Sequence, residues 1–264
     1  MPTKNFRKVR PGAGAQYYAA EASGLRWLEV PGGPPIPKIV SVGSAALELE
    51  RINESAPTVA SAVNFGKALS VMHRSGADSF GASPPDAPTT GWIADVPMPF
   101  GEFDTFGSMY AELRMRPYLK LCREADAFTA GDFAVFDELC EQLMGGSTSL
   151  VGPPEEPARL HGDLWSGNLL WAPDREGVAA GWLIDPAAYG GHRETDLAML
   201  MLFGVAQLDR IIASYDDAFP LAPGWRERVS LHQVYPLLVH TVLFGGGYAG
   251  QAVAAARRAL ALSR

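Results

Sequence analysis

The sequence predicts an α+β protein in which a small, β-rich N-terminal lobe precedes a larger, mainly helical C-terminal lobe. Residues 39–42 and 46–52 have the composition of strands, and the second alternates apolar and acidic residues. From residue 59 onward, apolar side chains recur every three or four residues over most of the chain, which is typical of packed helices. The 264 residues are enough for two such lobes. We place the boundary in a polar linker, which divides the chain into residues 1–53 and 54–264.

The N-terminal lobe is expected to contain one helix between strands. A first strand is predicted at residues 4–10, where Pro11-Gly12 would end it. Residues 15–28 follow with an apolar stripe of helical period, and a loop rich in proline and glycine joins this helix to the next strand.

The C-terminal lobe is expected to open with a helix after Pro57, because proline suits a helix start. Residues 75–104 are rich in proline and glycine, and we expect an ordered surface loop there. A strand pair is predicted at residues 170–171 and 181–184, and helices resume at Glu194.

Composition excludes several classes of protein. The net charge is −7 and no basic run occurs, which argues against nucleic acid as the main partner. No stretch approaches eighteen uninterrupted apolar residues, and no apolar segment follows the basic N-terminus, so we expect neither a membrane span nor a secretory signal. A cytoplasmic protein is expected, with Cys122 and Cys140 as free thiols in a reducing compartment.

The segments Leu160–Asn168 and Ile184–Pro186 carry the polar groups most suggestive of chemistry. Phosphoryl transfer to a hydroxyl needs one carboxylate to orient the hydroxyl, and amide and carboxylate oxygens to hold magnesium. Asp163, Asn168 and Asp185 meet that need, because the predicted strand pair would carry Asp185 back beside the other two. The alternative is a polar turn in which Asp163 and Asn168 cap backbone amides.

The string His161-Gly162-Asp163-Leu164-Trp165-Ser166-Gly167-Asn168 resembles the catalytic loop of aminoglycoside phosphotransferase-like kinases. Its tryptophan is similar to that of the fructosamine-3-kinase (ketosamine-3-kinase) family. Residues 184–198, 240–248 and 112–117 also resemble segments of that family, so the likeness extends from about residue 5 to about residue 250.

The resemblance implies a two-lobed protein-kinase-like fold that uses ATP and Mg²⁺. It implies that Asp163 is the catalytic base and that Asn168 and Asp185 are the magnesium ligands. It also assigns Lys8 to the ATP phosphates and Glu21 to an ion pair with that lysine. The alternative for Lys8 is a solvated basic strand, because Lys4, Arg7 and Arg10 surround it in the sequence.

Further residues are candidates for the nucleotide and acceptor sites. The segment from Glu48 to Ile52, which includes Glu50, would be the hinge whose backbone faces adenine. Trp165 would form a wall of the sugar pocket or belong to the core. Tyr189 and Asp216 are candidate acceptor-site residues, although nothing in the sequence separates that role from plain surface. His161 is expected to hold the catalytic loop through a hydrogen bond, and the other histidines are interpreted as structural.

We therefore expect an ATP-dependent phosphotransferase acting on a sugar hydroxyl of a ketosamine, either free or on a glycated protein lysine, and a monomer. A kinase of the aminoglycoside or choline type is an alternative. A second alternative is a nucleotide-binding protein with impaired catalysis. Such kinases have a glycine-rich hairpin before the lysine strand, and only seven residues precede Lys8 here, so a truncated lobe without that hairpin is expected.

Overall fold

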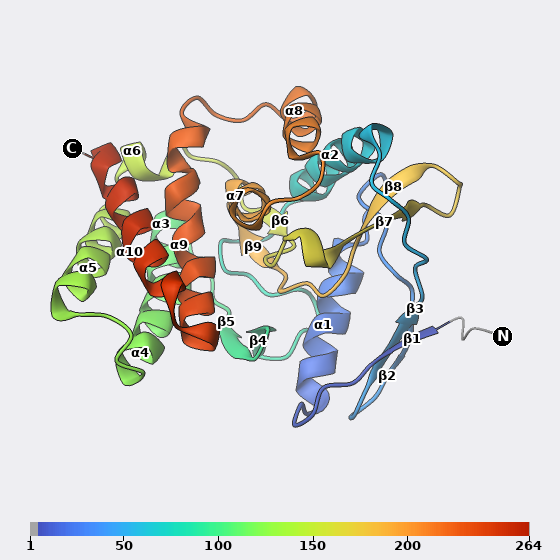
Figure 1. Cartoon of the computed structure of the whole chain (residues 1–264), viewed down its shortest axis with the longest axis horizontal. Helices are drawn as coiled ribbons and strands as arrows, with labels where there is room; N and C mark the ends of the chain where they lie inside the picture. The colour runs from blue at the N-terminus through green and yellow to red at the C-terminus, as the bar shows by residue number, and fades with distance from the viewer. Residues whose placement is uncertain (1–4, 264) are drawn as a thin grey trace.

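The computed structural model describes residues 5–263; its strand-rich N-terminal part lies at one end of the molecule and the last helices of the chain lie toward the other (Figure 1). Lys4, which the sequence analysis includes in the first strand, lies outside the described residues. The α+β class and the division into a small strand-rich part and a larger helical part are confirmed.

The N-terminal part is a three-stranded antiparallel sheet with one helix beside it. The strands occur in the order β1-β3-β2, and Lys8 at the end of β1 is opposite Leu47 of β3. The elements are β1 (Asn5–Lys8), α1 (Ala15–Leu28), β2 (Ile39–Val42) and β3 (Leu47–Glu50).

The C-terminal part consists of helices around three strand pairs, β4–β5, β6–β9 and β7–β8. Its longer helices are α2 (Val59–Arg74), α4 (Arg116–Glu124), α5 (Ala130–Met144), α7 (Glu194–Phe203), α8 (Leu208–Ala218), α9 (Trp225–Phe244) and α10 (Gly247–Leu260). Its strands are β4 (Thr90–Ile93), β5 (Val96–Pro99), β6 (Ala158–Leu160), β7 (Leu169–Pro173), β8 (Ala179–Leu183) and β9 (Tyr189–Gly191). Its short helical elements are α3 (Phe106–Met109), η1 (Tyr110–Met115), α6 (Thr148–Val151), η2 (Ser166–Asn168) and η3 (Ala261–Ser263).

Two hydrophobic clusters form the core. One lies among α3, α4, α5, α9 and α10. The other combines α1 and β3 with α2, β7, α7 and α8, so the N-terminal part shares a core with the start of the helical part. The apolar interior is therefore continuous across residue 53, and the lobe boundary there stays a prediction.

Two segments differ from the sequence-based expectation. Residues 75–104 are not only loop, because β4 and β5 form a hairpin within them that buries Ile93, Val96 and Met98. Residues 106–115, in the region expected to consist of packed helices, form a single turn of α-helix followed by the π-helix η1. None of the helices within residues 5–263 combines the length and the apolar character that a membrane crossing would require.

Candidate active site

The catalytic-loop residues and the metal-ligand candidates meet where β6, β7 and β8 end. The Asn168 amide nitrogen donates to the Asp163 carboxylate (Oδ2, 2.9 Å) and to the Asp163 carbonyl (2.8 Å). Asp185 follows β8, and the backbone N–H of Ile184 donates to the Asn168 carbonyl at 3.1 Å. The β7–β8 hairpin thus brings Asp185 beside the loop, as expected from the spacing in the sequence.

Lys8 faces this cluster from the N-terminal sheet. Its ammonium nitrogen lies 2.7 Å from Glu21 Oε2 and 3.0 Å from Asp185 Oδ1. The Lys8 ammonium of β1 therefore contacts both α1, through Glu21, and the segment after β8, through Asp185. Lys8 does not point to solvent on the far side of the sheet, because its side chain is only 17% exposed.

Close packing of α1 on the Asp185 segment sets this geometry. A Cβ placed on Gly24 would lie 3.2 Å from the Pro186 side chain and 3.3 Å from that of Ala188, so the helix approaches as closely as a glycine allows. Glu21 lies almost one turn earlier on the same helix. The approach of α1 therefore carries the Glu21 carboxylate to Lys8.

The backbone of the catalytic loop requires a left-handed conformation at Gly162, where φ is +80°. A Cβ at that position would lie 2.0 Å from the Ala187 carbonyl oxygen. Asp185 also has a positive φ, +53°, which is uncommon for a residue other than glycine. Conformations of this kind are concentrated at functional sites, where the surrounding structure enforces them.

Asp196, near the start of α7, stabilises the backbone of the catalytic loop. Its carboxylate accepts hydrogen bonds from the backbone N–H groups of His161 (2.8 Å) and Gly162 (2.9 Å), and it lies 3.2 Å from His73 Nε2. His161 in turn lies 2.9 Å from the Ile184 carbonyl through Nε2, and its Nδ1 accepts from the Asp163 N–H at 3.2 Å. The expected structural role of His161 is therefore confirmed.

The charges of the site are strongly perturbed. Burial raises the pKa of Asp163 to about 7, the Asn168 hydrogen bond opposes that rise, and the nearby Asp185 and Asp196 add to it. Burial also raises the pKa of Glu21 to about 7, against the effect of Lys8. Burial alone would lower the pKa of Lys8, but Glu21 and Asp185 outweigh it and raise that pKa. A carboxyl whose pKa is near neutrality is suited to accept a proton.

The group of oxygen atoms fits a magnesium ion. The Asn168 amide nitrogen donates to the Asp163 carboxylate and carbonyl and, at 3.4 Å, to the Asp185 carbonyl, so the amide oxygen is left as an acceptor. Asp185 adds a carboxylate that is 39% exposed. Amide and carboxylate oxygens are the ligands that Mg²⁺ prefers in proteins.

A cavity of about 240 Å³ lies over these groups and is lined by Lys8, Glu21, Asp163, Asn168 and Asp185 together. Aromatic residues that the sequence analysis did not select form other walls of this cavity: Tyr17, Trp92 and Phe100. Trp92 and Phe100 lie on and next to the hairpin that was expected to be loop. The sequence signal for this hairpin is weak, because Trp92, Ile93 and Ala94 are consecutive apolar residues and do not alternate with polar ones.

A second cavity of about 340 Å³ adjoins the first at Asp185. Glu50 and Ile52 line it, as the predicted hinge requires, together with Phe6. The Glu50 carboxylate itself is engaged elsewhere, by Arg175 at 2.6 Å and by the Lys38 N–H at 3.1 Å.

The three residues predicted to contact the acceptor are placed differently. Trp165 lines the first cavity and is 39% exposed, so it is not a core residue. Tyr189 is completely buried, because β9 directs it into the core, where its ring lies 3.9 Å from the Arg114 guanidinium carbon. Asp216 lines a separate hollow on α8 and accepts a hydrogen bond from the Leu221 N–H at 2.7 Å. The structure therefore brings Trp165 to the cleft and does not bring Tyr189 or Asp216 there.

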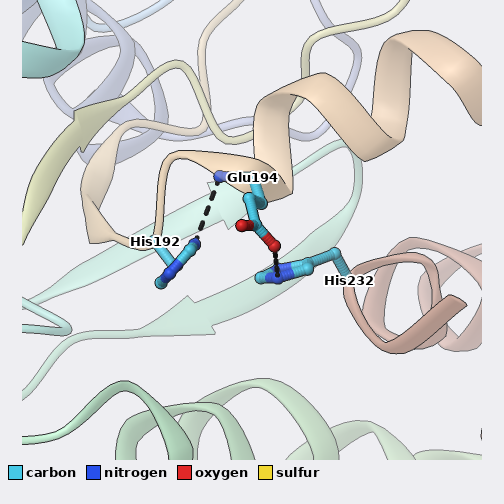
Figure 2. Close-up of side chains that lie close together, drawn as sticks. All are labelled: His192, Glu194 and His232. Atoms are coloured by element: carbon cyan, nitrogen blue, oxygen red, sulfur yellow. Dashed lines mark hydrogen bonds and ion pairs between the residues drawn. The ribbon is translucent and has the colours of Figure 1, made fainter. Parts of the chain in front are cut away.

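His192, Glu194 and His232 form a buried cluster outside the cleft (Figure 2). Forty positions separate the two histidines in the sequence, so spacing alone could not pair them. Glu194 lies 3.3 Å from His232 Nε2, but Arg228 also contacts both of its carboxylate oxygens, at 2.6 and 3.0 Å. A guanidinium in that position repels a metal cation. The cluster is therefore an ionic network that ties α7 to α9.

Comparisons with known proteins agree with this geometry. The family model described as fructosamine kinase matches residues 2–262. A protein of Synechocystis sp. named "probable ketoamine kinase" is 33% identical over 94% of this chain and 80% of that protein. Another protein of that name, from Escherichia coli, is 30% identical over 91% of this chain and 78% of its own length.

Solved structures show the same relationship. A crystal structure from Thermobifida fusca, described as a "putative fructosamine-3-kinase", has a TM-score of 0.87 and 42% identity, and covers 97% of this chain and 85% of that one. An aminoglycoside phosphotransferase at 16% identity, with a TM-score of 0.56, shares the fold, and covers 98% of this chain and 86% of that one. The protein-kinase-like fold implied by the sequence is thus confirmed. The chain is a small-molecule kinase and belongs to the fructosamine kinase family.

Proposed function

We propose that this kinase transfers the γ-phosphoryl group of ATP to a sugar hydroxyl of a ketosamine, the adduct of a sugar with an amine. One observation carries the proposal: Lys8, Asp163, Asn168 and Asp185, which come from distant parts of the chain, line one cavity. The names of the relatives, ketoamine and fructosamine kinases, support this class of acceptor.

In this proposal Asp163 orients the hydroxyl and accepts its proton. The hydroxyl oxygen forms a bond to the γ-phosphorus, and the bond from that phosphorus to the bridging oxygen of ADP breaks. Burial favours this role, because a carboxyl with a pKa near 7 is a stronger base than an ordinary aspartate. The Asn168 amide, through its hydrogen bond at 2.9 Å, fixes the direction of the Asp163 carboxylate.

We assign the phosphates to the groups around Lys8. Glu21 holds the ammonium at 2.7 Å and keeps it directed into the cleft, where it can face anionic oxygens. Asn168 and Asp185 would hold Mg²⁺, which neutralises phosphate charge when bound. The adjoining cavity at Glu50 and Ile52 is assigned to adenine, because it meets the first cavity at Asp185.

A coupled assay of ADP release tests the proposal. With a fructose–lysine adduct, ATP and MgCl₂, the protein should produce ADP together with one phosphorylated ketosamine. Asp163→Asn should lower kcat by roughly 10²–10⁴-fold, as expected for loss of a positioned base. Asp137→Asn, at an exposed position of α5, is the matched control and should keep full activity.

Parallel reactions with an aminoglycoside and with choline define the acceptor class. The ketosamine should have the highest kcat/KM of the three. The proposal is wrong if the ketosamine is not phosphorylated, or if Asp163→Asn turns over as fast as the wild type. Omission of ATP and chelation of divalent cations should each abolish ADP release.

A further inference from the structure

Five aromatic rings form a continuous chain that begins beside the catalytic loop. The ring centroids of Trp165 and Phe203 lie 6.3 Å apart, and those of Phe203 and His240 lie 4.7 Å apart. His240 then contacts Phe244 at 5.5 Å and Tyr248 at 5.0 Å. We call these five residues the aromatic strip.

Four separate elements build the strip. Trp165 precedes η2, Phe203 ends α7, His240 and Phe244 lie in the last turns of α9, and Tyr248 begins α10. Gly245 and Gly246 join the two last helices with φ values of +61° and +60°, at ψ values that side-chain-bearing residues avoid. This turn folds Tyr248 back onto His240, as the adjacent ends of α9 and α10 in Figure 1 allow.

The strip is partly open to solvent. Phe244 is 67% exposed and Trp165 is 39% exposed, whereas large apolar side chains are usually placed in the interior. The strip is also continuous with the proposed active site, because Trp165 lines the cavity that contains Asp163. An acceptor whose hydroxyl reaches Asp163 would extend its remaining atoms along this surface.

The electrostatic character of the strip favours a cation. Aromatic faces attract ammonium groups, and every ring contact within the strip joins neutral rings. His240 Nδ1 lies 2.7 Å from the Pro236 carbonyl, so the proton is on Nδ1 and Nε2 is left as an acceptor. Burial lowers the pKa of His240, against the effect of that carbonyl, so burial disfavours the charged imidazolium.

We infer that the aromatic strip binds the protonated amine of the acceptor, together with the substituent that this amine carries. The inference rests on the proposed function, because a ketosamine is a sugar with a secondary amine that is protonated near neutral pH. The strip would select cationic sugar-amines over neutral sugars of the same shape. Asp163 and the metal ligands act on the hydroxyl at the other end of the same molecule.

Two acceptors of nearly the same shape but different charge test the inference: the fructose adduct of benzylamine, which is cationic, and the neutral adduct in which an ether oxygen replaces the amine nitrogen. Phe244→Leu and Phe203→Leu keep apolar bulk but remove the π face. Each should raise KM for the cationic adduct by about two- to fivefold, the loss expected for one exposed cation–π contact. KM for the neutral adduct, KM for ATP and kcat should stay within the error of the wild type.

Val178→Ala is the matched control, because Val178 is 51% exposed in the β7–β8 turn, away from the strip, and should change neither KM. An equal rise of KM for both adducts would overturn the inference, since the contact would then be apolar only. Unchanged KM values would also overturn it, and so would a wild-type dimer that Phe244→Leu converts to monomers. If wild-type protein phosphorylates neither adduct, the proposed function itself fails, which is seen before any variant is compared.

Discussion

Replacing His192 by glutamine should reduce the decrease in the free energy of unfolding that this protein shows in mild acid. His192 is buried and its pKa is lowered to about 4, because burial disfavours its charged form and His232 and Arg193 add to that effect. Glu194 and Glu155 oppose it; the Glu155 carboxylate lies 3.8 Å from His192 Nε2. In the unfolded chain the same imidazole has a pKa of about 6.5.

The direction of this pH dependence follows from how many protons the folded and the unfolded chain bind. Between pH 6.5 and 4 the unfolded chain holds a proton on this histidine and the native chain does not, so acid favours unfolding. The stability that neutral His192 contributes is present above pH 6.5 and is lost as the pH falls toward 4. At pH 5 this loss amounts to about 2 kcal/mol, since each pKa unit of difference corresponds to about 1.4 kcal/mol.

Urea unfolding followed by circular dichroism at pH 7.5 and at pH 5 measures the effect. The wild type should lose about 2 kcal/mol more than His192→Gln over this interval. His192→Leu provides a second side chain that cannot bind a proton. Its free energy of unfolding should differ from that of His192→Gln by a constant amount at every pH, so the two variants should share the same pH dependence. Parallel pH curves for the wild type and both variants would refute the assignment.

Two further predictions concern the support of the catalytic loop. Asp196→Asn places an amide where a carboxylate accepts hydrogen bonds from the N–H groups of His161 and Gly162. It should therefore lower the free energy of unfolding by about 2–3 kcal/mol and reduce kcat. An unchanged free energy in urea unfolding and an unchanged kcat in the ADP-release assay would contradict this prediction. Gly162→Ala should abolish activity, because its Cβ would lie 2.0 Å from the Ala187 carbonyl. The matched control is Gly177→Ala, which has a similar φ of +84° but open space around the Cβ, so it should lose only about 1–2 kcal/mol of stability and keep its kcat.

Much of the site could be predicted from local sequence because its parts lie next to each other along the chain. Asp163 and Asn168 share one loop, and a single hairpin returns Asp185 to them. The ion pair of Lys8 with Glu21 was expected from the family resemblance, because the residues alone also allowed a solvated basic strand around Lys8.

Other features depend on contacts that the sequence does not encode locally. The β4–β5 hairpin was missed because Pro97 and Pro99 are unusual in strands, although an exposed strand tolerates them. Residues 106–115 lie in the region expected to be helical, but a π-helical segment gives them a different period from an α-helix. Tyr189 was expected to be a candidate acceptor-site residue, because nothing nearby in the sequence shows that β9 pairs with β6 and that the Tyr189 ring packs against Arg114.

The interior shared by α1, β3, α2 and α8 has a consequence for cooperativity. Leu25 of α1 and Ile211 of α8 belong to one apolar cluster, so a fragment ending near residue 53 would expose the surface that normally covers them both. We therefore expect the strand-rich end to unfold together with α2 and α8. A rearrangement that widens the cleft by small sliding of packed helices would keep this interior dry, whereas a free hinge would open it to water.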